Sequence, residues 1–207
     1  MLVAAAVVTI VPSGASMVSE PILQAAGARR VEVKPTTEAE PAPVARPPAA
    51  SASTKVMSAD AVDELRSRGL TLPVNGIKRD DLRDTFNELR GGSRRHEALD
   101  VLAPRNTEVQ AVEDGTIARL FLSDAGGITI YQFDPTSTYV YYYAHLERYA
   151  DRLKEGTAVK RGQVIGYVGT TGNAPRDTPH LHFAIFKLTA EKKWWQGAAI
   201  DPYSVLR

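Results

Sequence analysis

The second half of the chain is a series of short apolar runs in which large side chains alternate with small or polar ones, separated by glycine, proline and acidic turn residues. Alternation with a period of two is typical of half-buried strands, and regular turn signals between such runs indicate an all-β domain. From Arg95 onward the pattern predicts an antiparallel β-sandwich or barrel-like domain of about 110 residues, with room for only a short helix near residues 146–153. The predicted strands cover residues 108–112, 116–121, 128–133, 139–145, 164–168 and 180–186.

A mixed lead-in, residues 58–91, precedes this domain, which we place at residues 92–207. Ser58 can cap a short helix that Gly69 ends. Residues 70–74 then read as a short strand, and leucine and phenylalanine at helical spacing predict a second helix over residues 80–90. We expect these elements to be packing or lid material, and occlusion of a substrate groove by them is a hypothesis.

The first 57 residues differ in composition from the rest of the chain. Residues 1–28 begin with an apolar stretch that is shorter than the roughly 20 residues of a membrane span and resembles the apolar core of a secretory signal, although no Lys or Arg precedes Arg29. We therefore expect an export signal or an inner-membrane anchor and a protein of the periplasm or cell envelope, with a buried N-terminal strand as the alternative. Residues 29–57 are rich in proline and alanine, which predicts a disordered linker.

The composition narrows the chemistry that this chain can carry out. It contains no cysteine, which excludes disulfides, thiolate zinc ligands and a cysteine nucleophile. A net charge of +1 offers no basic footprint for nucleic acid. Any metal ion must therefore be held by histidine and carboxylate ligands.

The four histidines all fall in the strand-rich region and carry the candidate chemistry. His180 and His182 flank Leu181 in a predicted strand, so alternation places both imidazoles on one face. His96 and Asp100 are four residues apart, which places them on one side of either a helix or a strand. Imidazole nitrogens and carboxylate oxygens are ordinary zinc ligands. A hydrogen-bonded histidine pair and a surface ion pair are the alternatives without a metal, but the concentration of all four histidines in one domain favours a metal site.

Four motifs in a fixed order carry a resemblance to a known family. H-x-x-x-D begins at His96, Y-A-H-L covers residues 143–146, G-Q-V-I-G-x-V-G-x-T-G covers 162–172 and P-H-L-H-F covers 179–183. In this order they resemble the M23 (lysostaphin/LytM-like) zinc metallopeptidases, and the similarity covers residues 72–207. The resemblance implies a LytM-type catalytic domain. One departure is Glu97-Ala98 in place of the family's x-Gly, which leaves every ligand present.

The resemblance also implies a site and an activity. Zn²⁺ would be held by His96, Asp100 and His182 with water in the fourth position, and His145 and His180 would be the unligated catalytic pair. The chain would then be a zinc-dependent endopeptidase that hydrolyses peptide cross-links of peptidoglycan by metal-activated water, with stem peptides and cross-links as its partners. The first alternative is a non-catalytic LytM-like module that binds and activates a cell-wall amidase, although inactive members lose ligands that are present here. A third reading is a lipoyl- or biotinyl-carrier hairpin, but this chain lacks the lysine-centred motif that such a hairpin presents.

The surroundings of this site lead to further expectations. His180 is placed to act as base or as proton donor to the leaving amine, and His145 to act at the oxyanion, although the two roles can be exchanged. The tyrosines of residues 139–143 should divide by alternation between core and groove wall, and the loop 169–178 should help to form the groove. Carboxylates or carbonyls should fix the imidazole tautomers. The carboxylate candidates are Glu97, Asp177 and Asp201.

Overall fold

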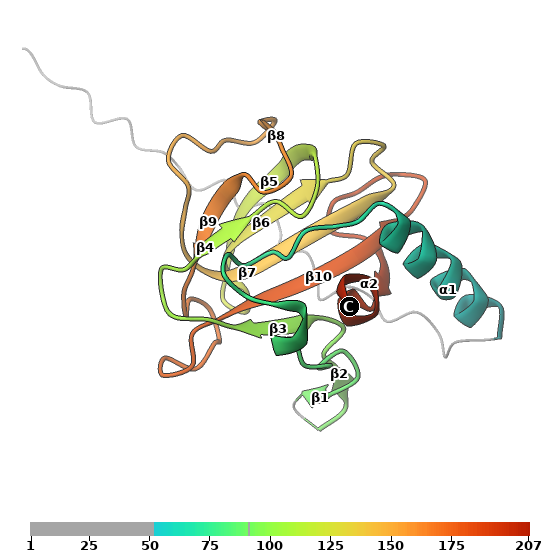
Figure 1. The fold of residues 1–207 in the computed structure, drawn as a ribbon, viewed down its shortest axis with the longest axis horizontal. Helices are drawn as coiled ribbons and strands as arrows, with labels where there is room; N and C mark the ends of the chain where they lie inside the picture. The colour runs from blue at the N-terminus through green and yellow to red at the C-terminus, as the bar shows by residue number, and fades with distance from the viewer. Residues whose placement is uncertain (1–51, 91) are drawn as a thin grey trace, which may run out of the picture. The chain divides into compact units, whose positions relative to one another are not determined.

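The computed structural model of the protein describes residues 52–90 and 92–207, and it has the mainly antiparallel β architecture that the alternation predicts (Figure 1). The predicted signal or anchor, residues 1–28, and the predicted linker up to residue 51 lie outside the described residues. The helices are α1 (Ala52–Ser67), the short 3-10 helix η1 (Arg79–Asp81) and α2 (Pro202–Leu206). None of the helices in the described part combines the length and the apolar character that crossing a bilayer requires.

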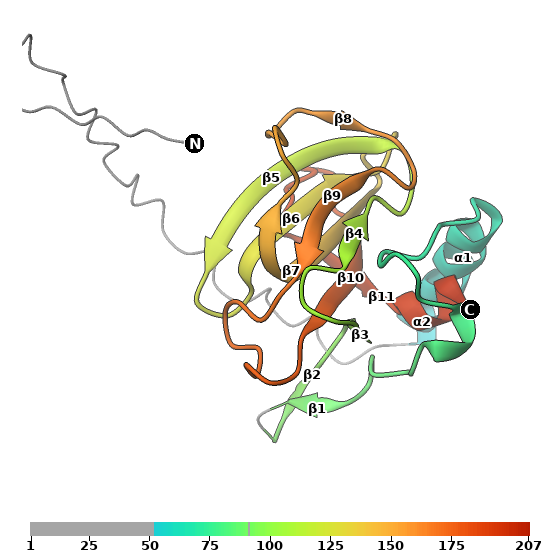
Figure 2. The same ribbon diagram turned by 60° about the vertical axis from the view of Figure 1, so that its left-hand side comes forward.

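The strands form one large sheet and one small ribbon. They are β1 (Leu89–Arg90), β2 (Arg94–Arg95), β3 (Leu99–Leu102), β4 (Glu108–Gln110), β5 (Gly115–Ser123), β6 (Gly127–Phe133), β7 (Tyr139–Tyr149), β8 (Ala158–Val159), β9 (Val164–Val168), β10 (His180–Leu188) and β11 (Gly197–Ile200). Among the described residues, nine strands form an antiparallel sheet in the order β11-β10-β7-β6-β5-β8, with β3 paired to β10 and β4 joined through β9. In the part of the chain that the structure describes, β1 and β2 pair only with each other. Figure 2 shows that the sheet curls strongly, with β10 and β11 reaching toward the two α-helices.

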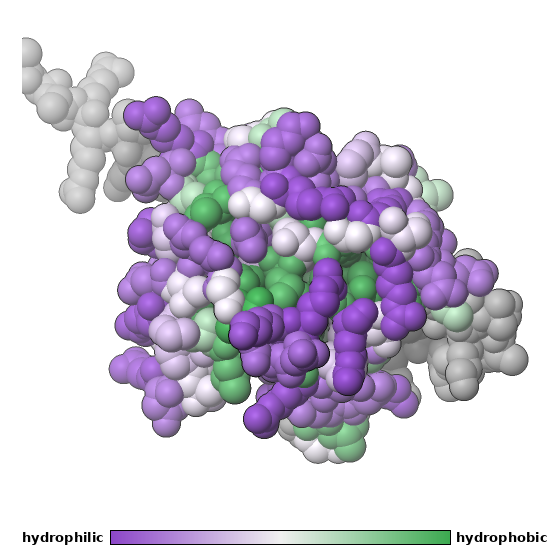
Figure 3. Space-filling view, viewed as in Figure 1, coloured by the Kyte–Doolittle hydropathy of each residue, from purple (hydrophilic) through white to green (hydrophobic). Residues whose placement is uncertain are grey.

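Strand β7 connects the core with the predicted site. Tyr139, Tyr141 and Tyr143 are fully buried, whereas Tyr142 lies on the opposite face and is half-buried, so the predicted division of the tyrosines between two faces is confirmed. Burying a large apolar side chain contributes about 1.5–3 kcal/mol, so this face stabilises the sheet. Figure 3 shows apolar residues in the middle of one face of the molecule, over β7 and β10, with polar residues around them. Strand β10 contributes Leu181, Phe183 and Ile185 to the same core.

An arginine attaches the lead-in helix to the sheet. Arg68, just beyond α1, donates hydrogen bonds to Glu64 at 2.6 Å, to Glu113 at 3.3 Å and to Asp134 at 3.0 Å. The Tyr139 hydroxyl donates to Glu64 at 2.7 Å, so the core strand and the helix share a carboxylate. Helix α1 also contacts α2 and β11 (Figure 2). The helix is thus an integral part of the domain.

Helix α1 lies at the opposite end of β10 from the predicted site. Tyr139, which bonds to Glu64 of α1, is the ladder partner of Lys187 near the end of β10. His180 is the first residue of that strand. The structure therefore gives α1 a packing role, and the hypothesis that the lead-in occludes a groove does not fit this helix.

The predicted helix over residues 80–90 is wrong. Only η1 forms, and the chain then reaches β1 through an irregular segment with a turn at Phe86 and Asn87. The Asp84 side chain accepts a bond from the Phe86 amide, a local bond that competes with a helix. The carbonyls of Phe86 and Glu88 accept from the amides of Glu97 and His96, at 2.9 Å each, so non-local partners use the groups that a helix would need.

Three smaller predictions also change. The helix near residues 146–153 is wrong because β7 continues to Tyr149 and pairs there with β9. The strand over 70–74 is reduced to a single bridge from Val74 to Val109, next to Pro73, which has no amide hydrogen to donate. The first helix begins at Ala52 rather than at Ser58.

Candidate metal centre

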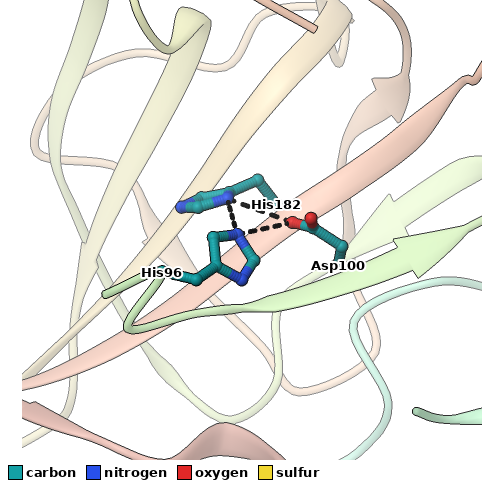
Figure 4. Close-up of side chains that lie close together, drawn as sticks. All are labelled: His96, Asp100 and His182. Carbon is teal, nitrogen blue, oxygen red and sulfur yellow. Dashed lines mark hydrogen bonds and ion pairs between the residues drawn. The ribbon is translucent and has the colours of Figure 1, made fainter. Parts of the chain in front are cut away.

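Three potential ligand atoms converge at the ends of β3 and β10 (Figure 4). His96 Nε2 lies 2.9 Å from His182 Nδ1 and 3.0 Å from Asp100 Oδ1, and His182 Nδ1 lies 3.1 Å from the same oxygen. Two atoms that each lie about 2.0–2.1 Å from one tetrahedral zinc ion are about 3.3 Å apart. Small shifts that move these side chains apart would therefore suffice to hold an ion.

Strand register brings two of these residues together. In the antiparallel β3–β10 ladder, His182 is directly opposite Asp100. Directly opposed side chains point to the same face of a sheet, about 4.5–5.5 Å apart at their Cβ atoms. The register of the sheet thus places His182 beside Asp100, a proximity that the spacing of the motifs in the sequence does not predict.

His96 reaches the same point from a tight turn after β2. Glu97 has a φ of 57°, in the left-handed region, and this turn directs the chain from the ribbon into β3. The ring of His96 donates from Nδ1 to the Thr85 carbonyl at 3.0 Å. Because neutral imidazole carries one proton, Nε2 is left with a free lone pair that faces Asp100 and His182.

Thr85 also holds the second ligand. Its hydroxyl accepts a hydrogen bond from the Asp100 amide at 3.0 Å and donates to the Ala98 carbonyl at 3.2 Å. One threonine therefore fixes the tautomer of His96 and the backbone position of Asp100.

The carboxylate of Asp100 is held in its charged form. Burial opposes its ionisation, but the adjacent imidazoles of His182 and His96 outweigh burial and keep the pKa of Asp100 well below its usual range. Arg90 donates from Nη2 to the outer oxygen Oδ2 at 2.7 Å, while Oδ1 faces the two histidines. Asp100 is thus available as an anionic ligand.

His145 and His180 lie beside this cluster. Their ring centres are 5.0 Å apart, and His145 is 5.6 Å from the ring of His182. His145 donates from Nδ1 to the Thr171 carbonyl at 2.9 Å and His180 from Nδ1 to the Thr178 carbonyl at 2.8 Å. In the neutral form of each ring Nε2 therefore carries no proton, and His180 Nε2 lies 3.9 Å from Asp100 Oδ1.

A β-bulge aims His145 at the cluster. β7 pairs with β10 as far as Ala144 and with β9 from Leu146, and His145 between them has a φ of 60°. Bulges and left-handed non-glycine residues are typical of places where a side chain is redirected at a functional site. Burial, together with His182 and His180 nearby, lowers the pKa of His145 to about 4.

The structure brings all five predicted site residues together, and it corrects what surrounds them. The carbonyls of Thr85, Thr171 and Thr178 fix the histidine tautomers, as one of the two expected options. Within the described residues, the three carboxylate candidates have no hydrogen bond to a histidine; Asp201, for example, caps α2 instead. Thr85 and Arg90 were missed because they lie in a segment that the sequence pattern assigns to a helix. The candidates now set aside are Glu97, Asp177 and Asp201.

Comparisons with known proteins support the family resemblance that the four sequence motifs indicate. Residues 94–202 match the sequence profile of peptidase family M23. The L-Ala–D-Glu endopeptidase of Bacillus subtilis is 36% identical over 132 residues, which are 60% of this chain and 39% of the relative. The peptidoglycan DD-endopeptidase ShyC of Vibrio cholerae is 34% identical over 98 residues, 47% of this chain and 22% of the relative. The match thus spans well under half the length of these curated relatives.

Solved structures share the fold. Lysostaphin from Staphylococcus simulans aligns with a TM-score of 0.50 and 28% identity, over 61% of this chain and 48% of that one. Csd3 from Helicobacter pylori aligns with a TM-score of 0.51 and 26% identity, over 67% and 34% respectively.

Proposed function

The chain belongs to peptidase family M23, and from this premise we propose that it is a zinc endopeptidase that hydrolyses peptide bonds of peptidoglycan. The observation that carries the proposal is the convergence of His96 Nε2, Asp100 Oδ1 and His182 Nδ1 within 3.1 Å of one another. The curated relatives named as peptidoglycan endopeptidases support the substrate class.

The donor set suits zinc. Two imidazole nitrogens and one carboxylate oxygen are typical of catalytic zinc sites, which use three protein ligands and keep a position open, whereas structural sites fill all four. When bound, zinc lowers the pKa of water toward about 7 and polarises a carbonyl group. An amide hydrolase also needs groups that accept and return protons.

We assign proton uptake to the Nε2 atoms of His145 and His180. Each ring has its Nδ1 proton engaged by a backbone carbonyl, so Nε2 accepts a proton before it can donate one. From the sequence, we expect His145 to donate a hydrogen bond to the oxyanion. His145 can do so from Nε2 only after Nε2 has taken up a proton. The proton taken from water by one imidazole can then pass to the leaving amine.

Export is part of the proposal, since the substrate lies outside the cytoplasm. The apolar start of residues 1–28 supports an export signal or an inner-membrane anchor. The amidase-activator alternative gains no support here, because all three ligands are present and assembled.

Digestion of purified peptidoglycan tests the proposed activity. We expect zinc-loaded protein to release peptide fragments that mass spectrometry can assign to a cleaved amide bond, and we expect His145→Ala to lose this release while it keeps its metal. Stimulation of an added amidase by a chain that releases no peptides itself would instead favour the alternative.

A further inference from the structure

A row of aromatic rings leads away from the candidate metal centre. The ring of Tyr142 meets His182 edge-on at 5.9 Å, and Tyr131 lies 4.7 Å from Tyr142. Trp194 lies 4.5 Å from Tyr131, and Trp195 lies 5.0 Å from Trp194. We call Tyr142, Tyr131, Trp194 and Trp195 the aromatic strip.

The sheet register builds the inner half of the strip. Tyr131 of β6 is the ladder partner of Tyr142 on β7, and Tyr142 is in turn opposite Ala184 on β10. His182, two residues before Ala184, faces the same side by alternation. The two tryptophans follow β10 in the connection to β11, and Trp194 folds back onto Tyr131 and Phe121.

These rings pack on one another rather than on the hydrophobic core. Tyr131, Tyr142 and Trp194 are half-buried, and Trp195 is 39% exposed. None of them belongs to the core cluster of the described residues or to the partly buried apolar side chains packed against it. A row of partly exposed aromatic side chains beside a site, most exposed at its outer end, is typical of a ligand-binding surface.

Cationic groups border the outer end of the strip. The Arg119 guanidinium lies 5.9 Å from the centre of the Trp194 ring, and Lys193 Nζ lies 6.0 Å from that of Trp195. Arg119 is also 3.4 Å from Glu155. A suitable ligand therefore has flat apolar faces for stacking, polar edges for water and nearby acidic groups.

We propose that the aromatic strip binds sugar rings of the peptidoglycan glycan strand beside the peptide that the metal centre cleaves, an inference that rests on the proposed function. Pyranose rings of N-acetylated amino sugars present C–H faces that stack on indole, while their hydroxyl and amide groups stay at the edges. The stem peptide starts on such a sugar and carries carboxylates, which complements Lys193 and Arg119. An extended residue spans about 3.3 Å, so a sugar is only a few residues away from any stem-peptide bond.

The protein contains its own reporter for this site. Trp194 and Trp195 are the only two tryptophans of the sequence, so intrinsic tryptophan fluorescence arises from the strip alone. We expect titration of the full chain with peptide-free glycan strands, or with the N-acetylglucosamine tetramer, to give a saturable change in intensity or wavelength. A sugar-free stem peptide should not produce it.

A matched pair of variants locates the response. Trp195→Ala should weaken glycan binding roughly three- to tenfold, as expected for the loss of one stacking partner, while Trp194 still reports. Leu122→Ala removes an apolar side chain that is 72% exposed on β5, outside the strip, and should leave binding unchanged. In cleavage assays Trp195→Ala should lower kcat/KM for a glycan-attached peptide and leave that for the free peptide unaltered.

The binding titration separates this inference from the proposed function, because it requires no cleavage. A chain that binds glycan but cleaves nothing would support the strip and contradict the peptidase. A chain that cleaves peptidoglycan but shows no fluorescence response to glycan would overturn the sugar site, and so would a response to the sugar-free peptide alone.

Discussion

At the scale of single residues, the candidate site depends on a threonine that carries no chemistry of its own. The Thr85 backbone carbonyl holds the His96 ring and the Thr85 hydroxyl holds the Asp100 amide, so one residue orients two predicted ligands. Groups that orient ligands in this way typically change metal affinity when they are removed. The ligands themselves could be found from motif spacing, but Thr85 could not, since only the folded chain brings it to residues 96–100.

Thr85→Val should lower zinc affinity about 10- to 100-fold. Valine keeps the shape of threonine but leaves the Asp100 amide without its acceptor, while the Thr85 carbonyl remains. Competition with a chromophoric chelator measures the change. Thr85→Ser keeps the hydroxyl and serves as the control, and equal affinities for the valine and serine variants would contradict this role.

At the scale of elements, local patterns predicted the strands well and the helices poorly. Period-two alternation is a property of each strand's own sequence, so the predicted bounds of β5, β6, β7, β9 and β10 are close to the observed ones. The chain over residues 80–90 is not helical beyond η1 because the carbonyls of Phe86 and Glu88 bond to the amides of residues 97 and 96, partners that no local pattern reveals. Likewise, β7 passes residue 146 because β9 is available to pair with it.

The close approach of Gly172 to residues 125–127 allows a test of how the position of His145 is maintained. Gly172 has a φ of 71°, and a Cβ there would lie 2.4 Å from both the Ala125 carbonyl oxygen and the Gly127 amide. Gly172→Ala should therefore displace the adjoining Thr171 carbonyl, which orients His145, and should reduce activity while zinc binding is retained.

A second glycine-to-alanine variant separates the effect of the steric contact at Gly172 from the effect of left-handed backbone strain. Gly156 has a φ of 79° but no atoms within 4 Å of an added Cβ, so Gly156→Ala should cost only about 1–2 kcal/mol from the left-handed backbone. Gly172→Ala should cost clearly more in urea unfolding. Equal losses of stability, with activity preserved, would show that the turn does not position His145.

At the scale of the whole described unit, a buried charge network joins the lead-in helix to the large sheet. Asp134 accepts hydrogen bonds from Arg68, from the Tyr139 amide and from Thr136. The Tyr141 hydroxyl donates to Glu113 in the same region. Breaking one member of such a network leaves buried polar groups unpaired, which costs more than an exposed ion pair contributes.

This network should make the protein sensitive to acid. Burial raises the pKa of Asp134, but hydrogen bonds from Thr136, the Tyr139 amide and Arg68 outweigh it and keep the pKa below its usual range. Its stabilisation is thus complete above the unfolded-state pKa of about 3.9 and is lost as the pH falls through the lower native value. Urea unfolding between pH 2 and pH 7 should show a weaker decline for Asp134→Asn than for wild type, and parallel curves would contradict the assignment.

We propose that His96, Asp100 and His182 hold a catalytic zinc ion while His145 and His180 do not. Elemental analysis of protein purified without nickel and then reconstituted tests it most directly. We predict about one zinc per chain in the wild type and in His180→Ala, and loss of zinc in His182→Ala. A wild type that takes up no zinc, or a His182→Ala variant that retains it as firmly as His180→Ala, would contradict the account.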